Sequence, residues 1–168
     1  MKRVGATSEQ AVVDGFFGKV VVTVENEAVC AVRIVQKGAA GEELPAGDAT
    51  IHSPVLRSAV AQLRRYLSGE GRNFDLPLRL GGTPFQQAVW REAAAIPYGA
   101  SRTYGQIATR LGRPRAARAV GQALSRNPVP LFIPCHRIVA GNGGMGGYTP
   151  DPSIKKALLK HEGVADFG

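Results

Sequence analysis

Residues 103–126, TYGQIATRLGRPRAARAVGQALSR, contain the pattern that decides the fold. Thr103 and Gln106 form a capping box, which predicts a helix that opens there and ends at Gly112. After a two-residue connection, Pro114 is expected to start a second helix that runs to about Arg126. A helix, a glycine-containing turn and a second helix are the spacing of a helix-turn-helix, in which the second helix reads nucleic acid.

The second predicted helix is unusually thin, since it contains Ala116, Ala117, Ala119, Gly121 and Ala123. Such small residues allow tight packing against a neighbouring helix, or close approach to a duplex. Both interpretations can hold, because one face can pack while the other binds. The predicted DNA contacts on and around this helix are Arg115, Arg118, Gln122 and Arg126, with Arg137 further along the chain.

The charge distribution also favours a nucleic-acid partner. The chain has 21 Lys and Arg against 13 Asp and Glu, a formal net charge of +8. No acidic residue occurs between Glu92 and Asp151, a window with seven arginines: Arg102, Arg110, Arg113, Arg115, Arg118, Arg126 and Arg137. Genomic bias could explain arginine in place of lysine, but not the missing carboxylates. Arginine pairs with phosphate at two points, so we expect salt-dependent binding to DNA or RNA.

The first eighty residues predict a small α/β domain. Residues 19–24 and 28–35 are valine-rich strands around a turn, and residues 8–14 are a candidate third strand. Ser53 and Pro54 open a helix that ends before Gly69. Residues 74–80 alternate like a strand, which Pro77 would restrict to an edge.

Gly81-Gly82 is the predicted domain boundary. A further capping box at Thr83 and Gln86 predicts a helix to about Ile96. The expected class is therefore α/β (α+β). A domain at residues 1–80 has a mixed or antiparallel sheet with a helix, and a mainly helical, winged-helix-like domain at residues 83–168 carries the helix-turn-helix.

Length and composition restrict the protein class. With 168 residues and 44% hydrophobic residues, the chain is expected to form one domain or two small ones. Cys30 and Cys135 lie far apart, which favours a reduced cytoplasmic thiol protein over a disulfide-bonded one. No apolar stretch approaches the ~18 residues of a membrane span. No dimerisation helix is recognisable, so a monomer is expected.

Cys135 and His136 follow an apolar run, PVPLFIP, at residues 128–134. A thiol becomes a nucleophile when a base or a cation favours the thiolate, and the neighbouring His136 and Arg137 could do so. A lone cysteine is, however, often only a small buried apolar residue. The glycine-rich loop 141–147 that follows is either a flexible surface loop or a wall against which a planar ligand lies.

The motif IPCHRIV at residues 133–139, with the later Gly-Gly-Tyr148, resembles the active-site signature of the O6-alkylguanine-DNA alkyltransferases. The resemblance extends over residues 83–163. It implies DNA repair by direct damage reversal, in which the protein flips the damaged guanine out of the duplex and transfers its alkyl group irreversibly to its own cysteine. The implied partner is double-stranded DNA containing O6-alkylguanine, with O4-alkylthymine as a further candidate substrate. No cofactor is implied.

The resemblance also assigns roles to individual residues. Cys135 matches the alkyl acceptor, His136 the base that takes the thiol proton through a water, and Glu162 the carboxylate that orients His136. Tyr104 matches a phenol that donates to the guanine, and Arg118 the side chain that fills the space left in the base stack. Taken alone, Tyr104 could only pack, Arg118 could only contact phosphate, and Glu162 could be a solvated helix end.

The family's pocket wall corresponds to Met145, Tyr148 and Thr149, and Asn127 corresponds to an asparagine that braces the turn before the active site. Pro150 stands where the family usually has glycine, which affects the stiffness of the loop. Cys30 and His52 are too few ligands for the N-terminal zinc site of some members, so no metal is expected.

Two other classes remain as alternatives. One is a DNA-binding protein without chemistry, either a helix-turn-helix regulator or an alkyltransferase-like damage sensor; the presence of Cys135 argues against the sensor. The other is a Cys-His hydrolase, which would turn over repeatedly and would not need the arginine-rich region.

Overall fold

The computed structural model describes residues 8–41, 43–45, 50–149 and 151–165. The chain divides into two compact units, residues 1–80 and 81–168. Each unit is described by itself.

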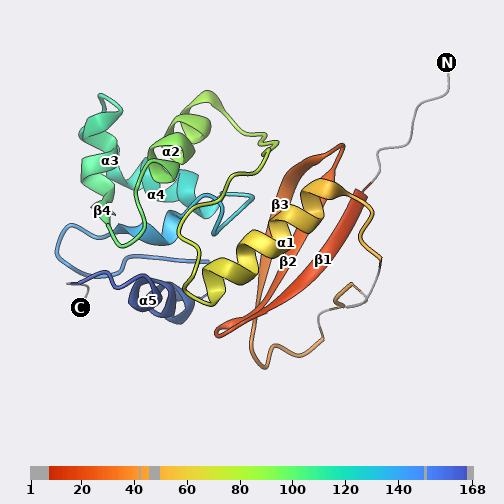
Figure 1. The fold of residues 1–168 in the computed structure, drawn as a ribbon. Coiled ribbons are helices and arrows are strands. Elements are labelled where there is room, and N and C mark those ends of the chain that lie inside the picture. The colour runs from red at the N-terminus through yellow and green to blue at the C-terminus, as the bar shows by residue number, and fades with distance from the viewer. Residues whose placement is uncertain (1–7, 42, 46–49, 150, 166–168) are drawn as a thin grey trace, which may run out of the picture. The chain divides into compact units, whose positions relative to one another are not determined.

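The first unit is a three-stranded antiparallel sheet covered by one helix. The strands β1 (Ser8–Gly15), β2 (Gly18–Glu25) and β3 (Ala28–Gln36) lie in the order β1-β2-β3. Helix α1 (Pro54–Leu67) packs across the sheet (Figure 1) and is capped by Ser53, as predicted. Asn26 and Glu27, which connect β2 and β3, have φ angles of 48° and 55°. Two left-handed residues give a turn whose twist matches that of a hairpin.

The predicted strand at residues 74–80 is wrong. This segment makes only an isolated bridge, in which Val29 donates to the Pro77 carbonyl at 2.8 Å and accepts from the Arg79 amide at 2.9 Å. Pro77 has no N–H, so it cannot contribute a donor to a longer ladder.

The second unit is mainly helical, as predicted. Helices α2 (Pro84–Ala94), α3 (Tyr104–Arg110) and α4 (Ala117–Ser125) pack against one another. The capping boxes expected before α2 and α3 are both present. Helix α4 begins later than expected, at Ala117, because a turn closed by the Ala116 amide on the Arg113 carbonyl at 2.8 Å occupies the preceding residues.

Short elements then bring distant segments together. Strand β4 (Arg102–Thr103) pairs in parallel with β5 (Ile138–Val139), directly after the 3₁₀ turn η1 (Cys135–Arg137). This pairing places the start of α3 beside the segment that follows Cys135. Helix α5 (Pro152–His161) begins at the cap Asp151 and also packs against η1.

Two features are absent from the described residues. No helix among them has the length and apolar character that a membrane crossing requires. They also contain no group of three or more His, Cys, Asp or Glu side chains arranged to hold a metal ion.

Candidate active site

Cys135 is held by an ordered turn between α4 and η1. The Asn127 amide donates to the Ile133 carbonyl at 2.9 Å, and its oxygen accepts from the Val129 N–H at 3.0 Å. The Cys135 N–H donates to the Ile133 carbonyl at 2.8 Å. Asn127 therefore connects two backbone groups of the turn that precedes Cys135. The thiol is buried, and the residue is 8% exposed.

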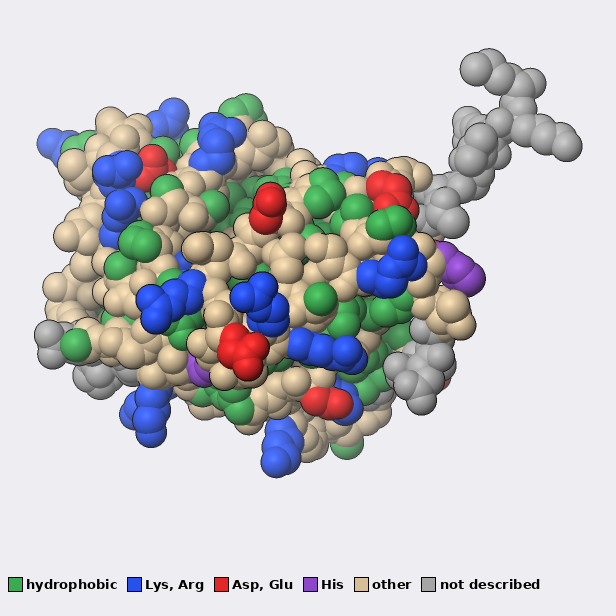
Figure 2. Space-filling model, in the orientation of Figure 1, with side chains coloured by type: hydrophobic (Ala, Val, Ile, Leu, Met, Phe, Trp, Pro, Cys, Tyr) green, Lys and Arg blue, Asp and Glu red, His purple; other side chains and the backbone are tan. Residues whose placement is uncertain are grey.

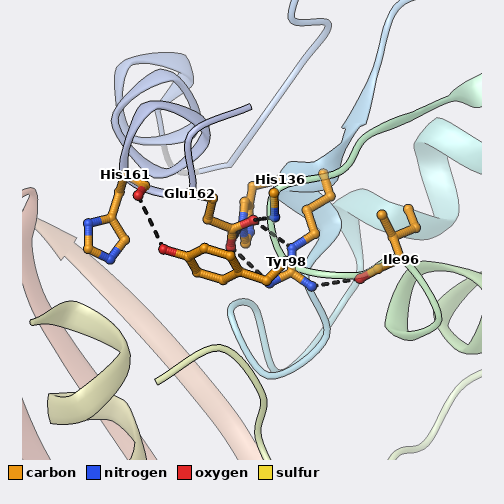
Figure 3. Close-up of polar contacts among 7 residues, drawn as sticks. Ile96, Tyr98, His136, His161 and Glu162 are labelled. Atoms are coloured by element: carbon orange, nitrogen blue, oxygen red, sulfur yellow. Dashed lines mark hydrogen bonds and ion pairs between the residues drawn. The ribbon is translucent and has the colours of Figure 1, made fainter. Parts of the chain in front are cut away.

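His136, Arg137 and Glu162 form a buried cluster between η1 and the end of α5 (Figure 3). His136 Nε2 lies 2.8 Å from Glu162 Oε1, and Arg137 donates from Nε to Oε2 at 2.8 Å and from Nη2 to Oε1 at 2.9 Å. The structure thus brings together the predicted base and the predicted carboxylate, which are 26 residues apart in the chain.

The protonation states of this cluster follow from its geometry. Burial alone would raise the pKa of Glu162, but hydrogen bonds from His136 and Arg137 outweigh it and lower that pKa to about 2. Burial lowers the pKa of His136, so its imidazole is neutral at neutral pH, although Glu162 opposes this shift. An ionised carboxylate only accepts, so Nε2 carries the imidazole proton. Nδ1 is buried without a hydrogen-bond partner among the described residues and is left as an acceptor.

The Cys135 thiol is protonated in the resting protein. Burial raises its pKa, while hydrogen bonding to Asn127 and Tyr148 and the positive charge of Lys155 act in the opposite direction. The thiol therefore needs a base to become a nucleophile. The free Nδ1 of the neighbouring His136 is suited to that task.

Tyr104, at the start of α3, lies in a narrow space between α4 and the glycine-rich loop. Its hydroxyl donates to the Gly147 carbonyl at 3.3 Å. A Cβ atom on Gly146 would lie 2.7 Å from that hydroxyl, and one on Gly121 would lie 3.6 Å from the ring. Both glycines thus allow backbone to approach the tyrosine closely.

Lys155 on α5 is a site residue that sequence reasoning missed. It is fully buried, and its Nζ donates to the Ile138 carbonyl at 2.5 Å and lies 3.5 Å from the Tyr104 hydroxyl and 3.4 Å from the Gly147 carbonyl. Burial lowers the pKa of Lys155 to about 8. The signal was available, because Lys155 occupies the same helical stripe as the buried Ile154, Leu158 and Leu159.

The predicted pocket residues lie on the loop between β5 and α5. Met145 and Tyr148 are partly buried, and Thr149 is exposed. The loop is closed by the Ala140 N–H, which donates to the Gly144 carbonyl at 2.8 Å. Pro150, whose effect on the loop was in question, lies outside the described residues.

Arg137 was predicted to bind DNA, and this prediction is wrong. The side chain is buried on Glu162 and donates from Nη1 to the Ile96 carbonyl at 2.7 Å, so it cannot reach a phosphate. Two other arginines of the acid-free region, Arg102 and Arg110, pair with Glu92.

Besides Arg110, which is exposed but paired with Glu92, four arginines of the region lie on the surface, and we call them the exposed arginine set: Arg113, Arg115, Arg118 and Arg126. Basic side chains stand out in Figure 2 where Figure 1 places α2 and α3. On α4, the buried Val120, Ala123 and Leu124 form a packed face, and the exposed Arg118 and Gln122 lie on the opposite side. One face of this thin helix therefore packs and leaves the other accessible.

Comparison with known proteins gives consistent matches. Residues 84–164 match the family model for the DNA-binding domain of 6-O-methylguanine DNA methyltransferase. The methylated-DNA–protein-cysteine methyltransferase of Methanosarcina acetivorans is 49% identical over 107 residues, 64% of this chain and 69% of that protein. The constitutive enzyme of Bacillus subtilis is also 49% identical over 107 residues, 64% of this chain and 65% of that protein.

The fold agrees over a longer stretch than the sequence. The O6-methylguanine methyltransferase of Mycobacterium tuberculosis superposes with a TM-score of 0.79 at 34% identity, covering 94% of this chain and 93% of that one. A second M. tuberculosis structure, of a complex with DNA, has the same TM-score at 36% identity and covers 94% of this chain and 96% of that one. The chain therefore belongs to the family of methylated-DNA–protein-cysteine methyltransferases.

Proposed function

We propose that this protein repairs DNA by moving the alkyl group of O6-alkylguanine irreversibly onto Cys135. The observation that carries the proposal is a buried thiol beside an ordered His136–Glu162 pair, in a unit that exposes a basic helix-turn-helix. One Sγ–C bond forms and the C–O6 bond breaks, so each molecule reacts once. No cofactor is needed, because guanine is the leaving group and the thiol supplies its proton.

His136 acts as the base. Its Nδ1 accepts the Cys135 proton through a water, and the imidazolium that forms is stabilised by the ionised Glu162, which is already bonded to Nε2. The order of nucleophile, base and orienting carboxylate is that of catalytic triads, with a water inserted between the first two.

Tyr104 and Lys155 act on the leaving base. The Tyr104 hydroxyl donates to the guanine ring as negative charge develops there, and the Lys155 ammonium, 3.5 Å from the phenol oxygen, stabilises the tyrosine when its proton is drawn away. Met145, Tyr148 and Thr149 form the wall against which the flipped base lies.

The exposed side of α4 binds the duplex. Arg118 fills the space of the extruded guanine, and Arg115, Gln122 and Arg126 contact the DNA around it. Flipping costs a few kcal/mol of unstacking, which a damaged base pair reduces.

Intact-mass spectrometry after incubation with a duplex that contains one O6-methylguanine tests the proposal. A gain of one methylene unit, about 14 Da, on the peptide with Cys135 is expected, because a thioether forms once and is not hydrolysed. An unchanged mass with retained affinity for the lesion would indicate a damage sensor instead. Repeated turnover on an ester or amide without DNA would indicate a Cys-His hydrolase.

A further inference from the structure

The Arg137 guanidinium donates three hydrogen bonds in the buried cluster of Figure 3. It binds both oxygens of Glu162 and the Ile96 carbonyl, and the Glu162 side chain is fully buried. A guanidinium presents its donors in a planar fork and can satisfy all three acceptors at once. A lysine ammonium would retain the charge but not this geometry.

The turn after α2 supports the arginine and the carboxylate from the other side. The Arg137 guanidinium lies over the Tyr98 ring, 5.8 Å from its centroid, and the Tyr98 hydroxyl donates to the His161 carbonyl at 3.2 Å. The Gly99 N–H points to Glu162 Oε2 at 3.4 Å. The turn therefore fixes the end of α5, from which Glu162 extends.

The charges around His136 determine where a proton can reside. Glu162 favours a proton on the imidazole, and Arg137 and Lys155 oppose it. On the Cys135 side the thiol is neutral, and the Tyr98 ring lies against the Arg137 guanidinium. Arg137 and Lys155 disfavour the uptake of a second proton by the His136–Glu162 pair, because that proton would be buried beside a guanidinium and an ammonium.

We propose that Arg137 is a positioning residue for the alkyl transfer. By binding both oxygens of Glu162 it keeps the His136–Glu162 pair at a single proton, held on Nε2, so that Nδ1 remains free to accept the proton of Cys135. Tyr98 supports this arrangement by holding the guanidinium and the end of α5 in place. The inference rests on the proposed function, because it assigns a role within that reaction.

Removal of Arg137 should change the pH dependence of transfer as well as the rate. In Arg137→Gln the buried Glu162 loses its cationic partner, so the pair takes up an extra proton at a higher pH. An opposite charge at this distance shifts a carboxyl pKa by about one to three units. The acid midpoint of the transfer rate should therefore rise by about one to three pH units. Arg137→Lys should shift it less, because the charge remains.

Single-turnover transfer to a lesion-containing duplex, measured from pH 5 to 9, gives these midpoints. Arg110→Gln is the matched control, since it breaks an arginine–carboxylate pair with Glu92 on the surface of the same unit; its midpoint should equal that of the wild type. If Arg137→Gln and Arg137→Lys lower the rate equally at every pH, Arg137 has only a structural role and the proposal fails.

A second measurement does not depend on transfer. The ¹⁵N chemical shifts of His136 report which nitrogen is protonated. The wild type should stay neutral with Nε2–H from pH 6 to 9, Arg137→Gln should gain a proton within that range, and Arg137→Lys should titrate between the two. Identical titrations would overturn the positioning role even if transfer occurs. Failure of the wild type to methylate Cys135 would refute the proposed function, while the shifts would still decide whether Arg137 sets the state of His136. If Arg137→Gln does not fold, an Arg137→Lys titration equal to that of the wild type in both measurements overturns the proposal.

Discussion

Replacement of the buried Lys155 by methionine should make the protein more stable and less active. In the folded protein, burial lowers the pKa of Lys155 from 10.5 to about 8. At 1.36 kcal/mol per unit, burial of the ammonium therefore costs about 3 kcal/mol at pH 7, where the lysine is charged in both the folded and unfolded states. Methionine removes that cost, but it leaves the Ile138 carbonyl without its donor, at about 1–3 kcal/mol. We expect a net gain of up to about 2 kcal/mol at pH 7 and a large loss of transfer rate.

The sign of the pH dependence makes this prediction specific. Because the folded-state pKa is depressed, the unfolded chain retains the lysine proton between about pH 8 and 10.5, and wild-type stability rises with pH there by up to about 1.4 kcal/mol per unit. Below pH 8 both states are protonated and the slope vanishes. Lys155→Met lacks this contribution, so its advantage should shrink above pH 8, disappear by about pH 9.5 and reverse at higher pH.

Urea unfolding followed by circular dichroism at pH 7, 8.5 and 9.5 measures the difference. A Cys135→Ser background removes titration of the thiol. Lys156→Met is the control, because Lys156 is exposed on the same helix and should change stability by less than about 0.5 kcal/mol at each pH. A difference in unfolding free energy between Lys155→Met and the wild type that stays constant, or that increases with pH, would refute the reasoning.

Three further predictions concern the DNA surface and the pocket. Arg118→Ala should slow transfer from duplex DNA more than from the free base, since it supports flipping; an equal loss on both substrates would contradict this role. Gly146→Ala should cost about 1–2 kcal/mol in left-handed strain and slow transfer, because its Cβ would lie 2.7 Å from the Tyr104 hydroxyl. Gly147→Ala, with nothing within 4 Å, should do neither. Finally, four phosphate contacts from the exposed arginine set predict a slope of about −4 for log affinity against log salt in a gel-shift series with Cys135→Ser. A slope near about −6 would mean that the three carboxylate-paired arginines also reach DNA.

The local chemistry of the sequence predicted much of the second unit. The capping boxes at Thr83 and Thr103 fixed the starts of α2 and α3, because a cap depends on residues only three apart. The late start of α4 was missed, because the turn before it is closed by backbone atoms and has no side-chain signature. The prediction of a strand at residues 74–80 failed for a related reason. The alternation of apolar and polar residues does not show whether a neighbouring strand is present to pair with the segment.

The site was predictable where a motif defines it. Cys135 and His136 are adjacent in the chain, and the family signature connected them to Glu162. Arg137 was misassigned, because its position in an arginine-rich region suggests phosphate binding and the direction of its side chain is not encoded locally. Lys155 was missed because a lysine in an apolar stripe is ordinarily read as a solvated residue.

By itself, the sequence determined the helix-turn-helix spacing, the adjacent Cys135 and His136, and the excess of arginine, because each depends on residues close together in the chain. The tertiary structure decided which charges are paired. Glu162 binds Arg137 and His136 because a buried carboxylate stays ionised only when partners meet it at hydrogen-bonding distance, and nearer the surface Glu92 pairs with Arg102 and Arg110. These partners come from segments distant in the chain, so only the folded protein shows which arginines are paired with carboxylates and which are exposed.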